Sequence, residues 1–271
     1  MLDEKYSPLL DFNIIHGRTL CSKIIYSDAV PVVSISDDIH IITVINDSMM
    51  SNASINSIKF KKGTINYIIV DKYIKWISKI ESIKNYLTKE YDNLPDYILY
   101  IDGFDVLILK DILFPEKYLQ PYNCKILFNV EPGFWHTGFP SENNYFDPLY
   151  NDVKKRYIEL NEIKYGKKFE FGLNAGVFLG RKDYVLFLMN ETYNIMIDDI
   201  SKGFPYGCMD DQCALRYMIN LYYDDISVDV VNLLTFWGCD RAFVDGEMNE
   251  LKLDYFKTFF KGINYNQNII R

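Results

Sequence analysis

Short runs rich in Ile, Val and Tyr constrain the fold of this chain more than any other feature, together with one clear helical pattern that lies between two of them. The runs "IHIITVIN" (39–46), "INYIIVD" (65–71) and "YILYI" (97–101) are rich in β-branched or aromatic residues and have the length of buried strands. A fourth run, "KILFNV", covers residues 125–130. From Lys72 to Tyr91 apolar residues recur every three or four positions, which is typical of an amphipathic helix.

The order strand, helix, strand, helix, strand predicts an α/β fold, with a mostly parallel, Rossmann-like sheet and helices on both faces. Between the first two strands, residues 47–63 are expected to form a turn and a short helix that stops at a glycine. Further along we expect a strand at 171–180, helices at about 182–200 and 211–223, and a last strand at 226–234. The sequence contains no internal repeat and no flexible linker, so we expect one domain across residues 1–271.

The acidic composition argues against a general nucleic-acid binder. The formal net charge is −8 at pH 7, and no basic stripe is present. Lys72, Lys75 and Lys79 belong to the predicted amphipathic helix, where we expect lysines to fill the solvated face. A phosphate-bearing ligand would therefore need a metal cation to neutralise its charge.

The cysteines and residues 1–12 bear on the cellular compartment in which we expect the protein. The five cysteines are odd in number and scattered in spacing, which argues against a disulfide framework. Cys208 and Cys213 lack a matching Cys or His pair, so we do not expect structural zinc. Residues 1–12 lack the basic and apolar regions of a secretion signal, and no apolar run approaches the ~20 residues that span a bilayer. We therefore expect reduced thiols, no membrane span and a cytoplasmic protein.

Two carboxylates interrupt the most apolar part of the chain. In "YILYIDGFDVLIL" (97–109), Asp102 follows the third predicted strand directly and Asp105 comes three residues later. Ligands of such sheets bind outside the carboxyl ends of the strands, so the acids are expected at the mouth of the sheet. Adjacent carboxylates in a cleft repel each other unless a cation lies between them, and their oxygens suit Mg²⁺ or Mn²⁺. The pair predicts a divalent cation that bridges a diphosphate.

Three other interpretations compete with a metal site. The segment "DGFD" (102–105) is good turn chemistry by itself, with Asp bonding to nearby backbone and Gly supplying a free φ. A haloacid-dehalogenase-like phosphatase also carries acids after a strand, but its pattern places the second acid one position before Asp105. A nucleotidyltransferase needs a Gly-rich, basic phosphate loop after the first strand, and "NDSMMSNAS" (46–54) is not one.

Four segments, taken in order, resemble one family. They are "LYIDGFDVLIL" (99–109), "ILFNVEPGFWHTGFP" (126–140), "FGLNAGVFLG" (171–180) and "MDDQCALRYMI" (209–219). They are similar to motifs of the GT-A glycosyltransferase domain of the procollagen lysyl hydroxylases and of related collagen, viral and bacterial transferases. "IITVINDS" (41–48) is similar to the first strand and nucleotide loop of that domain. The resemblance extends roughly from Ile41 to Asn232, and its specificity lies in the order and spacing of the motifs.

The resemblance implies a UDP-sugar donor and a Mn²⁺ ion, or Mg²⁺ in its place. Asp102 and Asp105 would be the metal ligands. The residues implied near the nucleotide are Asn46, Asp47 and Ser48 beside the uridine, Phe104 next to them, and Lys72 near the diphosphate. The first three residues also suit an ordinary turn or helix N-cap.

The same resemblance implies residues around the sugar and the acceptor. Asn174, Ala175 and Gly176 would lie by the donor sugar, where Gly permits close backbone approach. A buried strand with a glycine needed only for packing would have the same sequence. Asp210 and Asp211 would supply a carboxylate near the anomeric carbon or the acceptor hydroxyl, although an Asp there also caps a helix. Trp135 would form an aromatic platform for a sugar ring.

Two departures from the family's pattern concern the site. The family has a third metal ligand, a His in a His-x-Asn-Gly stretch near the end of the domain. The histidines of this chain are His16, His40 and His136, and none lies in such a stretch. The metal would then be held by the two acids and water, or the site would be degenerate; His136, in the loop after Glu131, is a further candidate ligand. The family's longer acidic run is reduced here to Asp210 and Asp211.

The sequence therefore predicts a metal-dependent hexosyltransferase. Glucose or galactose would pass from a UDP-sugar to a hydroxyl acceptor on a protein or glycan. The resemblance implies hydroxylysine or galactosyl-hydroxylysine of a collagen-like chain as that acceptor. The alternative is a catalytically degenerate domain of the same fold that binds a nucleotide-sugar or a partner without turnover.

Overall fold

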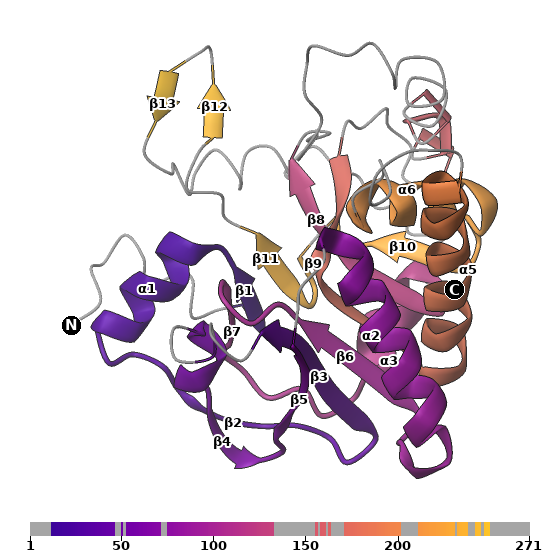
Figure 1. Cartoon of the computed structure of the whole chain (residues 1–271). Coiled ribbons are helices and arrows are strands. Elements are labelled where there is room, and N and C mark those ends of the chain that lie inside the picture. Colours follow the sequence, from indigo (N-terminus) through magenta and orange to yellow (C-terminus); the bar gives the residue numbers. More distant parts are fainter. Residues whose placement is uncertain are drawn as a thin grey trace.

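A six-stranded, mostly parallel sheet forms the centre of the molecule (Figure 1). The computed structural model describes residues 12–46, 50, 53–71, 75–132, 155–156, 158–160, 162–163, 171–201, 211–230, 232–237, 242–244 and 247–249. The strand order is β10-β8-β9-β6-β3-β5. The strands are β3 (Ile39–Asn46), β5 (Ile65–Val70), β6 (Tyr97–Ile101), β8 (Ile126–Pro132), β9 (Phe171–Arg181) and β10 (Ile226–Val228).

Only β9 runs against the others. It pairs antiparallel with both β6 and β8, whereas the remaining neighbours in this sheet pair in parallel. The carboxyl ends of the five parallel strands therefore share one edge of the sheet. The chain is thus an α/β protein with a mostly parallel sheet, compatible with the predicted Rossmann-like class.

Helices flank the sheet. α2 (Lys75–Glu90), α5 (Lys182–Ser201) and α6 (Asp211–Leu221) contact one another and strands of the sheet, whereas α1 (Arg18–Tyr26) lies at the opposite side in Figure 1. The shorter helical segments are α3 (Glu116–Leu119) and the 3-10 helices η3 (Ser54–Ser57), η4 (Tyr91–Asn93) and η5 (Gln120–Tyr122). The apolar residues of α2 that recur every three or four positions are buried, namely Ile77, Ile80, Ile83 and Leu87.

A small second sheet brings the N-terminal segment to the acidic turn. Its order is β11-β1-β7, formed by β11 (Thr235–Trp237), β1 (Ile14–His16) and β7 (Val106–Ile108). His16 at the end of β1 pairs antiparallel with Val106, the residue that follows Asp105. Two further pairs are β2 (Val32–Ser34) with β4 (Lys59–Lys62) and β12 (Ala242–Val244) with β13 (Glu247–Asn249).

Most predicted elements are confirmed, and two are corrected. The strands predicted at 39–46, 65–71, 97–101 and 125–130, and the one at 171–180, correspond to β3, β5, β6, β8 and β9, and the predicted helices to α2, α5 and α6. The strand predicted at 226–234 ends instead at Val228, because the next residue turns the chain. Of the segment 47–63, the described part forms η3 and then β4, and Gly63 with φ 106° follows that strand rather than a helix.

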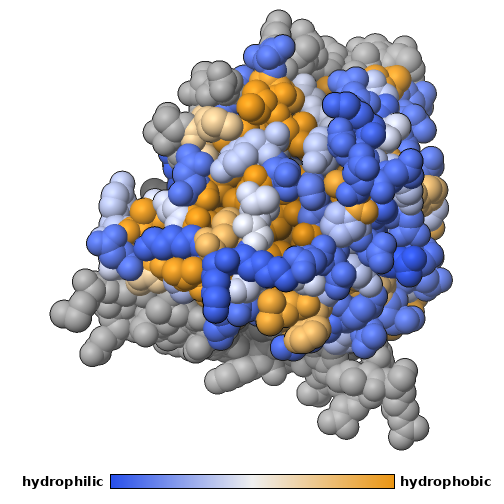
Figure 2. All heavy atoms as spheres, turned by 90° about the horizontal axis from the view of Figure 1, so that it is seen from below, coloured by the Kyte–Doolittle hydropathy of each residue, from blue (hydrophilic) through white to orange (hydrophobic). Residues whose placement is uncertain are grey.

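Apolar side chains also reach the surface. Figure 2 shows hydrophobic residues gathered near the middle of the face seen from below, among many hydrophilic ones. The most exposed large apolar residues include Tyr26, Val32 and Phe114. In the part of the chain that the structure describes, no helix combines the length and the apolar character needed to cross a membrane.

Candidate metal and ligand site

Asp102 and Asp105 lie at the carboxyl end of β6, as predicted. Ile101 before them and Val106 after them are fully buried, whereas each carboxylate side chain keeps 35% of its surface exposed. The backbone N–H of Asp102 still donates to the Gly176 carbonyl at 2.7 Å, so the turn is anchored to β9. Gly103 does not adopt a positive φ, so the turn does not require the conformational freedom of glycine. The acids stand at the mouth of the sheet, open to solvent.

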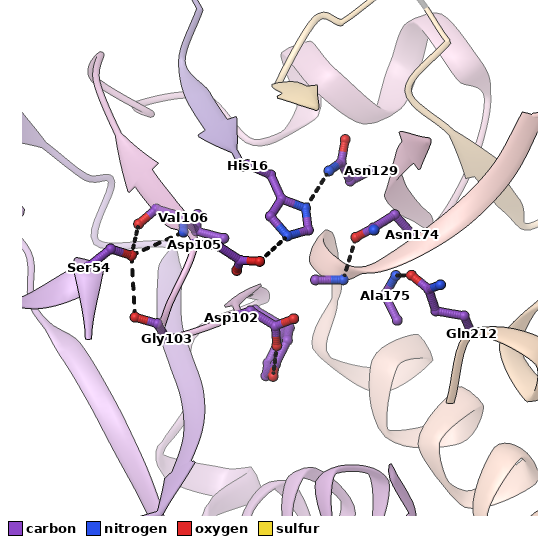
Figure 3. A network of polar contacts seen from close by, with 12 residues as sticks. His16, Ser54, Asp102, Gly103, Asp105, Val106, Asn129, Asn174, Ala175 and Gln212 are labelled. Atoms are coloured by element: carbon purple, nitrogen blue, oxygen red, sulfur yellow. Dashed lines mark hydrogen bonds and ion pairs between the residues drawn. The ribbon is translucent and has the colours of Figure 1, made fainter. Parts of the chain in front are cut away.

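His16 is the residue that sequence reasoning missed. It is buried at the end of β1, and its Nε2 lies 3.2 Å from Asp105 Oδ2 (Figure 3). His16, Asp102 and Asp105 each offer one ligand atom, and these atoms lie within 4.8 Å of one another. His136, the predicted substitute ligand, lies outside the described residues. The signal for His16 was the short segment "IIHG", an apolar pair that leads into His and Gly, but a three-residue strand is too short for a periodicity argument.

Lys79 supplies a positive charge inside the site. The predicted solvated face is wrong for this lysine, because Lys79 is buried on α2 and points at the sheet edge. Its Nζ lies 3.2 Å from Asp102 Oδ1 and 2.9 Å from Asp211 Oδ2, and donates to the Ala175 carbonyl at 2.9 Å. The ring of Tyr100 lies 4.8 Å from the ammonium. Four groups from three elements therefore hold this one cation.

Each of the two acids thus has a partner within the chain. We expected adjacent carboxylates that need an external cation, but Asp102 pairs with Lys79 and Asp105 pairs with His16. Tyr100 also donates its hydroxyl proton to Asp102. Burial by itself would raise the pKa of Asp105, but the interactions with His16 and Lys79 outweigh this effect and lower that pKa. Asp105 is therefore ionised at neutral pH.

A buried network fixes His16 from behind. Asn129 Nδ2 lies 2.9 Å from His16 Nδ1 (Figure 3). Asn129 Oδ1 accepts from the backbone N–H of Val130 at 2.9 Å and from the hydroxyl of Thr235 at 2.7 Å. Because Asn129 and Thr235 are buried, these hydrogen bonds are shielded from water, and the ring has one fixed orientation.

The pairing of β9 with β8 is irregular next to the acids. Phe128 on β8 pairs with Phe178 and the next residue, Asn129, pairs with Asn174, so residues 175–177 of β9 have no partner in β8. Helix side chains bond the backbone there instead. Ala175 N–H donates to Gln212 Oε1 at 3.1 Å, and its carbonyl accepts from Lys79. The bulge thus places α6 and α2 side chains at the site.

Asn174 and Gly176 form part of this bulge. Asn174 Oδ1 accepts the Gly176 N–H at 2.8 Å. A Cβ on Gly176 would lie 2.4 Å from His16 Cε1 and 2.9 Å from His16 Nε2. The close approach that glycine permits is therefore an approach of the His16 ring. Gly176 thus lies beside the acids and Asn174 holds its backbone, whereas their predicted place by a donor sugar stays a prediction.

The structure describes three further predicted residues, Asp211, Asn46 and Phe104. Asp211 is buried at the start of α6, where its carboxylate holds Lys79. Asn46 ends β3, and its side-chain amide donates to the Asp71 carbonyl at 3.5 Å; Phe104 packs partly buried against the core. The residues that lie outside the described part of the chain are Asp47, Ser48, Lys72, Trp135 and Asp210.

The site as built suits a hard cation. It presents carboxylate oxygens that are partly exposed and convergent, which are the ligands preferred by Mg²⁺ and Mn²⁺. Lys79 is held by Asp211 and the Ala175 carbonyl as well as by Asp102, so it stays compensated when Asp102 turns toward another cation. The residues present therefore fit a divalent cation. In comparisons with known proteins, no family model and no curated sequence matches this chain.

Proposed function

We propose that the chain is a metal-dependent glycosyltransferase that moves glucose or galactose from a UDP-sugar to a hydroxyl acceptor. The observation that carries this proposal is the placement of Asp102 and Asp105, partly exposed at the carboxyl edge of a mostly parallel sheet. That edge is where α/β sheets bind nucleotides. The motif order given above supports the GT-A variant of this fold.

Asp102 and Asp105 would hold Mn²⁺ or Mg²⁺. The cation would supply charge neutralisation for the diphosphate of the donor and for the oxygen that leaves with it. Asp105 enters this role already ionised and oriented by His16. Lys79 neutralises the buried Asp211 carboxylate, so Asp102 and Asp105 would leave the site with the negative charge that attracts a cation.

The remaining assignments follow the sequence prediction. The uridine would lie at the end of β3 by Asn46, Asp47 and Ser48, with Phe104 beside it. The donor sugar would lie along the β9 bulge, where the backbone at Ala175 and Gly176 is irregular. Because Asp211 is committed to Lys79, Asp210 is the better candidate for the carboxylate near the acceptor hydroxyl.

The proposal also covers the acceptor, other partners and the cellular location of the protein. The acceptor would be a hydroxyl group on a protein or glycan, with hydroxylysine or galactosyl-hydroxylysine of a collagen-like chain as the case implied by the resemblance. Nucleic acid is not an expected ligand for a chain of net charge −8. A cytoplasmic location remains part of the proposal.

Calorimetric titration of UDP with and without Mn²⁺ tests the proposal. We expect binding that requires Mn²⁺ in the native chain and is at least about tenfold weaker in Asp105→Asn. Asp37→Asn is the matched control, because Asp37 is an exposed acid that pairs with the side chain of Lys62 in a surface ion pair. Hydrolysis of a panel of UDP-sugars then identifies the donor. Equal UDP binding by native and Asp105→Asn chains would contradict the metal assignment.

A second candidate is a domain that binds a nucleotide-sugar without turnover. The observation that favours it is that Lys79 and His16 already pair with the two acids. A domain of that kind would bind UDP equally well with and without Mn²⁺, and would not hydrolyse any UDP-sugar of the panel. The same titration therefore separates the two functions.

A further inference from the structure

The orientation of the Asn129 side chain determines the chemistry of His16. The backbone N–H of Val130 can only donate, and it lies 2.9 Å from the atom assigned as Asn129 Oδ1. If the amide were turned over, its NH₂ group would face this N–H, and two donors would oppose each other in a buried place. Asn129 is therefore fixed with its oxygen toward Val130 and its NH₂ group toward His16.

The imidazole must then accept at Nδ1. A nitrogen that accepts from the Asn129 NH₂ group carries no proton, so the proton of the neutral ring is on Nε2. Nε2 lies 3.2 Å from Asp105 Oδ2, in the position of a donor to that carboxylate (Figure 3). Each contact in the chain Val130, Asn129, His16, Asp105 thus has one donor and one acceptor.

This arrangement is the reverse of a metal-binding histidine. A His that ligates through one nitrogen donates its other N–H to a carboxylate, carbonyl or water. Ligation through Nε2 would require a proton on Nδ1, which would point at the Asn129 NH₂ group. The ring also packs closely against β9, because a Cβ on Gly176 would lie 2.4 Å from its Cε1 and 2.9 Å from its Nε2.

We propose that His16 positions Asp105 as an Nε2–H donor and does not ligate the metal, so that the site takes a hard cation on oxygen ligands alone. This inference deepens the proposed function and rests on it where metal is concerned. It also predicts selectivity: without an imidazole nitrogen the site should prefer Mn²⁺ or Mg²⁺, and Zn²⁺ should gain little from its affinity for nitrogen.

Nitrogen NMR of the histidine rings tests the tautomer directly. In the metal-free native chain we expect His16 in the Nε2–H form, and an Nδ1–H form would overturn the inference. On addition of Mg²⁺ we expect the Nε2 proton to remain, whereas its loss would show ligation. If Mg²⁺ changes no resonance near Asp102 and Asp105, the proposed metal site fails, and the metal-free tautomer still decides the role of His16.

The variant Asn129→Asp provides a second test, because it should convert His16 from a donor to Asp105 into a metal ligand. The new carboxylate would accept a hydrogen bond from His16 Nδ1–H, and this tautomer would leave Nε2 without a proton and able to ligate. We expect the preference for Zn²⁺ over Mn²⁺, measured by competitive titration, to rise by about tenfold or more. Asn66→Asp is the matched control, because Asn66 contacts His40 rather than His16, and it should leave the preference unchanged. An unchanged preference in a folded Asn129→Asp chain would contradict the inference.

Discussion

Two acidic turns at the same edge of the sheet have different surroundings. Asp229 follows β10 and Asp102 follows β6, and both strands run in the same direction. Asp229 is fully buried and accepts from the backbone N–H groups of Leu233, Leu234 and Thr235, each at 2.8 Å, and from the Tyr122 hydroxyl. Its partners are all neutral donors of the chain itself.

The turn after β6 differs in exposure and in the charge of its partners. Asp102 and Asp105 keep about a third of their surface in water and pair with Lys79 and His16. Asp229 is enclosed by donors that close a turn, so it serves the fold. The other two acids keep oxygen atoms available to a ligand. A carboxylate after a parallel strand is therefore a site candidate only when it retains open surface.

The largest effect on stability is expected at the enclosed turn. Asp229→Ala removes the acceptor of three backbone N–H groups, and each buried donor left without a partner costs about 1–3 kcal/mol. We expect a loss of at least ~3 kcal/mol in the free energy of unfolding by urea. Asp37→Ala, an exposed acid, is the control. A loss below about 1 kcal/mol would remove the contrast between the two turns.

Lys79→Met should come next. It leaves Asp211 buried without its cation, and breaking a buried ion pair costs about 3–5 kcal/mol, reduced to roughly 2–3 here because Asp102 is partly hydrated. The double variant Lys79→Met with Asp211→Leu should recover much of this loss in the same unfolding measurement. Lys89→Met, on an exposed lysine of the same helix, should change little. A single variant as stable as the native chain would contradict the buried pair.

Gly176→Ala should act through His16. The new Cβ would lie 2.4 Å from His16 Cε1, so the ring must shift, and overpacking of this kind costs about 1–3 kcal/mol. Unfolding and Mn²⁺ titration should both be affected, because Asp105 loses its donor. Gly103→Ala is the matched control on the acidic turn, where the nearest atom would lie 3.4 Å away. Similar losses for both variants would argue against the His16 contact.

The smallest effect on stability is expected for Asp105→Asn. A partly exposed ion pair contributes at most about 1 kcal/mol. Because the pKa of Asp105 is lowered in the folded chain, its contribution is present at neutral pH, and its loss begins as the pH falls through the ordinary 3.8 and is complete only below the lowered pKa. Urea unfolding at pH 7 and pH 3 should therefore show a smaller difference between native and variant at pH 3 than at pH 7. A difference that grows toward pH 3 would reverse the sign.

The sequence predicted the frame of this molecule better than the contacts within the site. The strands β3, β5, β6 and β9 were readable because runs of β-branched and apolar residues have a clear length. Asp229 was taken for a strand residue, because the pattern of "ISVDVVNLL" does not reveal the N–H groups that its carboxylate would accept from.

His16 and Lys79 were missed for a related physical reason. Both reach the acids through contacts between residues far apart in the chain. Lys79 also stands at the border of the apolar face of α2. At such a position the helical spacing is the same whether the ammonium is buried or solvated. The partners of the Lys79 ammonium lie in the turn after β6, on β9 and on α6, and only the fold brings them to it.

A crystal structure of the native chain with Mn²⁺ and UDP tests the central claim most directly. The account predicts the cation in contact with carboxylate oxygens of Asp102 and Asp105 and with the diphosphate, with His16 Nε2 still on Asp105. A structure in which UDP binds elsewhere, while Asp102 remains on Lys79 and no cation contacts either acid, would contradict it.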